Sequence, residues 1–223
     1  MINIAIDGPS GAGKSTISKL AAEKFGFIYV DTGALYRAVG LYAVRCGIDP
    51  KNAEQSENIL KHAFIEMAYV NGSQRVYLNG DDVTDDIRTP QISKAASDIS
   101  AHTSVRKYLL DTQRKLAAEN NVIMDGRDIG TTILPEAQIK IFLTASPEDR
   151  AQRRYKELAA KGENVTYEEV LSDLKQRDYN DSHRSASPLK VADDAIVINT
   201  TGNTLEESVN IVVSTINKRM DYL

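Results

Sequence analysis

The stretch GPSGAGKS, residues 8–15, narrows the possible folds of this chain more than any other feature. It follows a short apolar run, 2–6, and precedes a segment of helical period, about 14–25. The pattern G-x-x-x-x-G-K-[ST] between a strand and a helix is typical of a P-loop, in which backbone N–H groups surround phosphate oxygens. Lys14 adds a charge for the β- and γ-phosphates, and the Ser15 hydroxyl can hold Mg²⁺. A chance match in a chain of this length is on the order of one in a hundred. The motif therefore predicts a nucleoside-triphosphate site made by Gly8, Pro9, Ser10, Gly11, Ala12, Gly13, Lys14, Ser15 and Thr16.

Short apolar runs alternate with longer helical patterns along the rest of the chain. Four further runs lack polar alternation, as strands buried on both faces do: 27–30, 122–124, 139–143 and 195–198. Helical patterns occupy about 14–25, 33–46, 90–100, 103–119, 147–161, 166–180 and 204–220. Thr204 and Glu207 form a capping box that opens the last of these. This alternation predicts an α/β fold with a parallel sheet flanked by helices.

One segment, 63–87, departs from this alternation. It contains two Asn-Gly pairs, at 71–72 and 79–80, each between alternating apolar residues. Asn-Gly in that setting is the strongest short signal for a β-hairpin. We therefore expect a small antiparallel insert in the parallel fold.

Length, charge and composition limit the class of protein. The chain has 223 residues and a formal net charge of −4, with 42% hydrophobic and 26% charged residues. These values predict one compact domain, 1–223, with an inserted lobe. Lys and Arg are spread through the sequence, which argues against a dedicated nucleic-acid binder. The N-terminus does not resemble a signal peptide, no run has the length of a membrane span, and Cys46 is the lone cysteine. We therefore expect a cytoplasmic protein that binds neither membranes nor nucleic acid.

A P-loop serves small-molecule kinases, GTPase switches and ATP-driven motors. A guanine-binding Asn-Lys-x-Asp motif is missing, because the one Asn-Lys pair, 217–218, continues with Arg-Met. A motor usually carries an acidic pair at the end of its second core strand, whereas Asp125 is followed by Gly126 and Arg127. Both observations favour a small-molecule kinase. An ATP-dependent switch or regulator stays as the alternative.

Charged residues follow two of the predicted strands. DTGALYR, 31–37, comes after the second strand, and DGRDIGT, 125–131, comes after the run 122–124. Strand ends of an open parallel sheet line the ligand crevice, so we expect Arg37 to lie near the triphosphate end. Asp31 or Thr32 can also serve simply as an N-cap.

Two further sets of charged residues have helical spacing. Arg150, Arg153 and Arg154 form the first set, and Arg177, Asp181 and Arg184 form the second if the helix persists that far. Guanidinium groups match the oxygens over which phosphoryl transfer spreads negative charge. We assign Arg154 to the ATP site and the segment of about 147–187, which Ser187-Pro188 ends, to a mobile lid.

Taken together, these motifs resemble the bacterial cytidylate kinases. GPSGAGKST, DTGALYR, the antiparallel insert, KAAS (94–97), VR (105–106), DGRDIGT, DRAQRR and RDYNDSHR occur in the family's order over essentially the whole chain. The resemblance implies phosphorylation of CMP or dCMP by ATP with Mg²⁺. It also implies a five-stranded parallel core, a monophosphate-binding insert at about 63–95 and a helical lid. Two residues depart from many relatives: Thr32 stands for serine, and Ser15 follows Lys14 where others have glycine.

The resemblance also implies roles for individual residues. Cytosine would be recognised by Thr32, Ser97, Arg106 and Asp128. The acceptor phosphate would be bound by Arg37 and Arg127, the ribose hydroxyls by Arg177 and Asp181, and phosphate by the lid residue Arg184. Cytosine needs an acceptor and donors together, which these side chains supply, and a carboxylate that faces its amine would reject uracil. We expect Lys14, Arg127 and Arg184 to be catalytic, Ser15 and Asp125 to hold the metal, and the chain to be a monomer.

Overall fold

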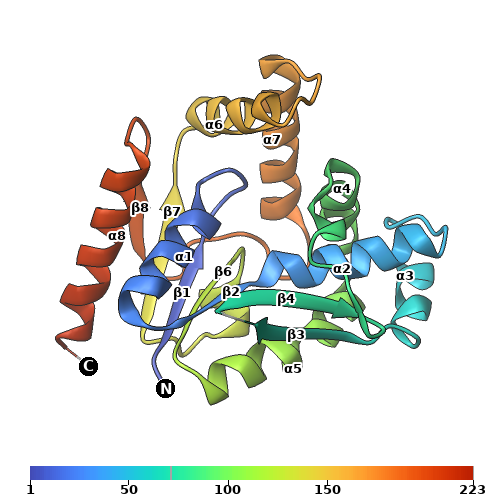
Figure 1. The fold of residues 1–223 in the computed structure, drawn as a ribbon, viewed down its shortest axis with the longest axis horizontal. Helices are drawn as coiled ribbons and strands as arrows, with labels where there is room; N and C mark the ends of the chain where they lie inside the picture. Colours follow the sequence, from blue (N-terminus) through green and yellow to red (C-terminus); the bar gives the residue numbers. More distant parts are fainter. Residues whose placement is uncertain (71, 223) are drawn as a thin grey trace. The chain divides into compact units, whose positions relative to one another are not determined.

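The structure is a computed structural model and describes residues 1–70 and 72–222. A five-stranded sheet has the strand order β2-β6-β1-β7-β8 (Figure 1). Its strands are β1 (Asn3–Asp7), β2 (Ile28–Asp31), β6 (Val122–Gly126), β7 (Ile139–Thr144) and β8 (Ile196–Asn199). β1 pairs in parallel with β6 and with β7, and β7 pairs in parallel with β8. The predicted parallel sheet is confirmed, and every predicted strand lies within two residues of its observed bounds.

Residues 2–29 and 121–223 form one compact unit of the chain. In it, α1 (Lys14–Phe25) packs against β6 and α8 (Leu205–Met220). Isoleucines of β1, β6 and β7 fill the core together with Ile17 and Val212. A separate small cluster of Ala151, Val170 and Leu174 joins α6 (Pro147–Ala160) to α7 (Tyr167–His183). Figure 1 shows this pair of helices beyond the carboxyl end of β7.

Met1 and residues 30–120 form the second compact unit. Its helices are α2 (Thr32–Arg45), α3 (Ala53–Leu60), the 3₁₀ turn η1 (Asp86–Arg88), α4 (Pro90–Ile99) and α5 (Thr103–Glu119). An antiparallel sheet of β3 (Ile65–Val70), β4 (Ser73–Leu78) and β5 (Asp81–Asp82) packs against α2. The predicted antiparallel insert is therefore present. The lobe predicted at 63–95 falls inside this unit, and its role as a monophosphate-binding insert stays a prediction.

The two predicted hairpins differ in how far they can be described. Asn79 and Gly80 both have positive φ, 52° and 90°, and they join Leu78 directly to its partner Asp81. Positive φ at both central positions is what a type I′ turn requires, and asparagine followed by glycine tolerates it best. In the other pair, Gly72 has a φ of 74°, and Asn71 lies outside the described residues.

Three of the described elements were not predicted: the 3₁₀ turn η1, the helix α3 and a π-helical turn. α3 is a short, polar helix whose N-cap, Asn52, accepts from the backbone N–H of Gln55. η2 (Ile129–Ile133) is a single π-helical turn that follows Asp128. The capping box of Thr204 and Glu207 is confirmed, and Thr166 with Glu169 forms a second one at the start of α7.

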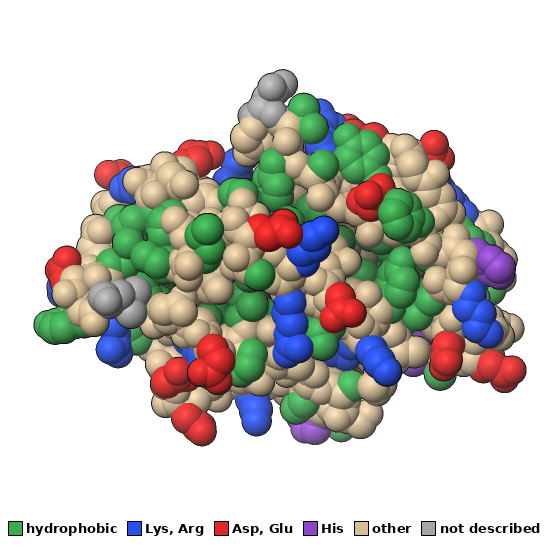
Figure 2. Space-filling view, turned by 90° about the horizontal axis from the view of Figure 1, so that it is seen from below, with side chains coloured by type: hydrophobic (Ala, Val, Ile, Leu, Met, Phe, Trp, Pro, Cys, Tyr) green, Lys and Arg blue, Asp and Glu red, His purple; other side chains and the backbone are tan. Residues whose placement is uncertain are grey.

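Charged side chains of both signs are interspersed on the face of the molecule that Figure 2 presents. Apolar side chains occur between them. None of the helices in the described part of the chain combines the length and the apolar character that crossing a membrane requires.

Candidate active site

The P-loop connects β1 to α1 through glycines that no other residue can replace without strain. Gly8 has a φ of 153°, and a Cβ built on it would lie 1.9 Å from the carbonyl oxygen of Leu143. Gly11 and Gly13 have φ angles of 73° and 83°, in the left-handed region that favours glycine. Gly13 is the N-cap of α1 and has no side chain to accept from its first-turn N–H groups. These groups are therefore left for an anion, as in other phosphate sites at helix N-termini.

Lys14 is buried at the first position of α1, with 5% of its surface exposed. Its Nζ donates to the carbonyl oxygen of Pro9 at 2.8 Å. Burial, reinforced by the nearby Arg127 guanidinium, lowers the pKa of Lys14 from 10.5 to about 7, although Asp125 and Asp181 act in the opposite direction. A bound triphosphate would supply the negative charge that favours the protonated ammonium.

Asp125, near the end of β6, is the partner of the P-loop hydroxyl. The Ser15 Oγ donates to Asp125 Oδ2 at 3.1 Å, and the Tyr29 hydroxyl donates to Oδ1 at 2.8 Å. A hydroxyl and a carboxylate are oxygen ligands of the kind that Mg²⁺ prefers, and Mg²⁺ in kinases commonly takes its other ligands from phosphates and water. The predicted metal pair, Ser15 and Asp125, is thus brought together and fits the ion.

The DGRDIGT segment meets the carboxyl end of α7. Arg127 Nε donates to Asp181 Oδ2 at 2.8 Å, and Arg184 Nη2 lies 3.4 Å from Asp128 Oδ1. Arg184 Nη1 also lies 3.7 Å from Asp181 Oδ1, so that positive and negative groups alternate. Burial alone would raise the pKa of Asp181, but Arg127 and Arg184 outweigh it and hold the pKa below its usual value. Four of the predicted site residues are therefore neighbours in one charge network.

The helical face predicted for Arg177, Asp181 and Arg184 is realised only in part. α7 continues to His183, three residues beyond the predicted end, and includes the first two of these residues. Arg184 is the C-cap, with an extended backbone, and its Nε donates to the carbonyl oxygen of Ser187.

In the other unit, Asp31 organises the start of α2. Its Oδ1 accepts from the backbone N–H of Ala34, and its Oδ2 lies 2.6 Å from Arg37 and 3.4 Å from Arg88. Gln74 of β4 accepts from the Asp31 N–H and donates to its carbonyl oxygen. Burial would raise the pKa of Asp31, but the two arginines outweigh it and lower the pKa. Asp31, and not Thr32, is therefore the N-cap, and it also orients Arg37.

The side chains predicted to recognise the base in this unit lie on three helices. Thr32 is buried at the start of α2, Ser97 is half-buried on α4, and Arg106 is buried on α5. The Arg106 guanidinium lies 5.4 Å from the ring centre of Tyr36, and its Nη1 donates to the carbonyl oxygen of Ser100. α2 and α4 approach closely at Gly40, where a Cβ would lie 2.9 Å from a backbone nitrogen of α4.

Comparison with known proteins identifies the family of the chain. The sequence model of the cytidylate kinase family matches residues 4–218. The cytidylate kinase of Caldicellulosiruptor saccharolyticus is 53% identical over 206 residues, 92% of this chain and 91% of that protein. The cytidylate kinase of Carboxydothermus hydrogenoformans is 46% identical over 222 residues and covers 100% of both chains. The chain belongs to the cytidylate kinase family. The resemblance predicted from its motifs is confirmed.

Among solved structures, an uncharacterized protein from Eubacterium ventriosum has a TM-score of 0.56 at 14% identity. The match covers 97% of this chain and 98% of the other, and it concerns the fold alone.

The three arginines of α6 do not act together in this cytidylate kinase family member. Arg150 is buried, and it donates to the backbone oxygens of Ser10 at 2.8 Å and Ala145 at 2.9 Å and to Asp178 at 2.6 Å. Arg153 donates to the carbonyl oxygen of Thr200 at 2.7 Å, and Arg154 pairs with Glu157 at 2.8 Å. Arg150 thus supports the P-loop backbone, whereas contact of Arg154 with ATP stays a prediction.

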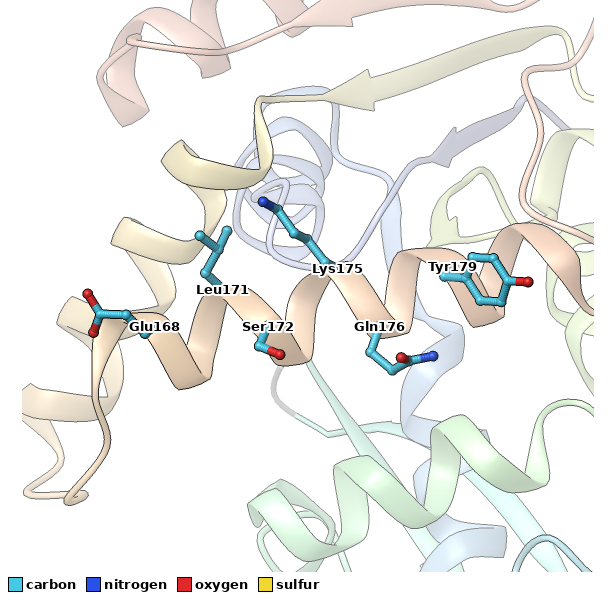
Figure 3. A pocket seen from close by; sticks show the side chains of 6 residues that line it. All are labelled: Glu168, Leu171, Ser172, Lys175, Gln176 and Tyr179. Carbon is cyan, nitrogen blue, oxygen red and sulfur yellow. The ribbon is translucent and has the colours of Figure 1, made fainter.

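A hollow of about 510 Å³ runs along α7. Figure 3 shows the six side chains that line it, all from this helix: Glu168, Leu171, Ser172, Lys175, Gln176 and Tyr179. Tyr179 is stacked on His183 with ring centres 4.0 Å apart. None of the six is a predicted site residue.

Several contacts that build the site were not predicted from the sequence. Tyr29 bonds Asp125 across 96 positions, Gln74 bonds Asp31 across 43, and Arg150, predicted as one of the arginines near the phosphates, bonds the Ser10 backbone across 140. Sequence spacing carries no signal for contacts of this kind. Asp7, a carboxylate directly before the P-loop, did give a sequence signal, because a charge at the end of an apolar strand is costly to bury unless it has partners.

Proposed function

We propose that this member of the cytidylate kinase family transfers the γ-phosphoryl group of ATP to CMP or dCMP, giving ADP and CDP or dCDP. The observation that carries the proposal is the charge network of Arg127, Asp128, Asp181 and Arg184, in the same compact unit as a P-loop with a buried lysine. A P-loop by itself supports any triphosphate chemistry. A carboxylate that can accept from a base and arginines that can bind phosphate indicate a nucleotide acceptor.

In this proposal the P-loop backbone and Lys14 bind the β- and γ-phosphates of ATP. The acceptor phosphate is already an anionic nucleophile, so no general base is required. Arg37 and Arg127 bind and orient that phosphate, and Arg184 stabilises the charge that develops on the transferred group. The protein then contributes alignment and electrostatic stabilisation, which are the main catalytic terms in phosphoryl transfer.

Ser15 and Asp125 are the residues that would hold Mg²⁺. The hydrogen bond between them supports Ser15 over Thr16 as the hydroxyl ligand. When bound, the ion neutralises charge on the β- and γ-phosphate oxygens. Tyr29 orients the Asp125 carboxylate in either case.

Base recognition is assigned to Asp128 and Arg106, with hydroxyls from Thr32 and Ser97. The ribose hydroxyls are assigned to Arg177 and Asp181. Asp181 pairs with Arg127 at 2.8 Å, so the residue assigned to the ribose also orients the arginine assigned to the acceptor phosphate.

The test is a comparison of ADP formation with CMP, dCMP, UMP and AMP as acceptors. We expect CMP and dCMP to be strongly preferred. Equal rates with UMP and CMP would contradict the base assignment. A phosphorylated product from an unrelated small molecule alone would favour another P-loop kinase, and slow hydrolysis with no phosphorylated product would favour a switch or regulator.

The role of Asp128 is tested by Asp128→Ala. Loss of a charged hydrogen-bond partner should raise the KM for CMP about 10- to 100-fold, while the KM for ATP changes little. Asp173→Ala, at an exposed position of α7, is the control and should change neither constant. Unchanged CMP kinetics in the Asp128 variant would show that this residue does not contact the base.

The proposal also includes a cytoplasmic location and a monomeric state. What supports them is the ordinary soluble composition, with its net charge of −4. Light scattering after size-exclusion chromatography tests the oligomeric state, for which a monomer of 24.6 kDa is expected.

A further inference from the structure

Asp7 is a buried carboxylate that the proposed chemistry does not use. It is the last residue of β1, directly before the P-loop, and 5% of its surface is exposed. Its Oδ1 accepts from the backbone N–H of Ile129 and its Oδ2 from that of Gly130, both at 2.8 Å. These two amides are the first of η2, the π-helical turn that follows Asp128.

Asp128 occupies the N-cap position of η2, and its side chain makes no cap hydrogen bond. An aspartate at an N-cap normally accepts from the N–H groups of its own first turn. Here Asp7, more than a hundred residues away in the sequence, accepts from two of those groups instead. The Asp128 carboxylate contacts Arg184 at 3.4 Å.

The geometry points to Asp7 as a positioning residue for acceptor recognition. We propose that its carboxylate caps η2 from outside, fixes the backbone that follows Asp128, and so holds the Asp128 side chain in the orientation that reads the base. The end of the strand that leads into the ATP loop would then be fastened directly to the segment that recognises the acceptor. This inference rests on the proposed role of Asp128.

The surroundings of Asp7 act on its carboxylate in opposite directions. Burial, with a contribution from the negative Asp128, raises the pKa of Asp7 to about 6, whereas the two backbone amides and Lys14 lower it. The approach at Gly130 is also close, since a Cβ there would lie 3.4 Å from Asp7 Oδ2 and 3.1 Å from the Lys140 side chain. The Asp7 carboxylate can accept from both amides, whereas an asparagine side chain can accept on its oxygen alone.

Asp7→Asn is the direct test. The amide can accept from one N–H but presents its own donor to the other, so one hydrogen bond is replaced by a donor–donor contact. We expect the KM for CMP to rise about tenfold and the preference for CMP over UMP to fall several-fold, with the KM for ATP changed less than about twofold. Asp193→Asn, at an exposed carboxylate of the same unit, is the matched control and should alter none of these values.

The outcomes separate this inference from the function on which it rests. If the unmodified protein does not prefer CMP to UMP, the proposed function fails. If it does, two results for Asp7→Asn would overturn the positioning role and make Asp7 merely structural. One is an unchanged preference for CMP over UMP, and the other is an equal rise in the KM for CMP and the KM for ATP.

A second variant keeps the test open if Asp7→Asn does not fold. Gly130→Ala adds a methyl group beside Asp7, and the flexible Lys140 stem can move to accommodate it. A smaller fall in the CMP-to-UMP ratio is expected for this variant. An unchanged ratio in a folded Gly130→Ala protein would also overturn the positioning role.

Discussion

Replacing Lys14 with methionine should change the stability of the nucleotide-free protein in a pH-dependent way. Lys14→Met keeps an apolar stem of similar length and removes the ammonium. In the folded chain, burial lowers the pKa of Lys14 from 10.5 to about 7. Between these two values the unfolded chain holds the proton and the folded chain does not. Unfolding therefore takes up a proton in this window, and the stability contributed by Lys14 rises with pH.

The size of the effect follows from the width of the window. Between the folded and unfolded pKa values of Lys14, each pH unit changes the free energy of unfolding by about 1.4 kcal/mol. Between pH 7 and pH 9, the stability of the native protein relative to Lys14→Met should therefore rise by about 2 kcal/mol, since the folded chain is only half deprotonated at pH 7. The same substitution should lower kcat at least about 100-fold, because a charge that stabilises the transferring phosphate is lost.

The assay is urea unfolding of both proteins without nucleotide at the two pH values, followed by far-UV circular dichroism. Other groups titrate between pH 7 and pH 9, and the comparison with the variant cancels their contribution. Lys19→Met, at an exposed position of the same helix, is the control, and its stability difference should stay within about 0.5 kcal/mol at both values. A stability difference for Lys14→Met that is constant or falls with pH would refute the reasoning from burial.

Two other substitutions test the groups around the site. Gly8→Ala should destabilise the fold by more than about 3 kcal/mol in thermal unfolding, because its Cβ would lie 1.9 Å from a strand carbonyl oxygen. Gly26→Ala, at a C-cap with open space around it, should cost only about 1 kcal/mol; equal losses would contradict the steric explanation. Asp31→Asn keeps an N-cap oxygen but removes the charge beside Arg37, and it should cost about 2 kcal/mol in urea unfolding. Asp86→Asn, in a half-exposed ion pair, should cost less than about 1 kcal/mol. A larger loss of stability for Asp86→Asn than for Asp31→Asn would contradict the explanation by burial.

The fold was predictable where local physics decides it. The P-loop conformation follows from glycines at fixed offsets, and the parallel strands follow from apolar runs without polar alternation. The Asn79-Gly80 turn follows from the backbone freedom of those two residues. α3 escaped prediction because its sequence is mostly polar and its few apolar residues, Ile59 and Leu60, gave too weak a period.

The sequence motifs identified many of the site residues, but they did not indicate which tertiary contacts position those residues. The sequence pointed to Ser15, Asp125, Arg127 and Asp128, and the structure pairs the first two directly. It gave no signal for Tyr29 on Asp125 or for Arg150 on the P-loop backbone, since these contacts depend on tertiary structure alone. The capping of η2 was unpredictable for the same reason, because its first two amides donate to Asp7 of the distant strand β1.

The buried charges around DGRDIGT explain how one chain keeps a strongly polar site folded before any nucleotide arrives. Each ionised group of the network has an opposite charge or backbone donors as its partner: Arg127 has Asp181, Arg184 has Asp128, and Asp7 has two amides. A group left unpaired at such depth would cost several kcal/mol. Lys14 differs, because its Nζ donates to the neutral carbonyl oxygen of Pro9 and burial lowers its pKa to about 7. Burial therefore disfavours the charge of the P-loop lysine, and the negative charge of a triphosphate would favour it.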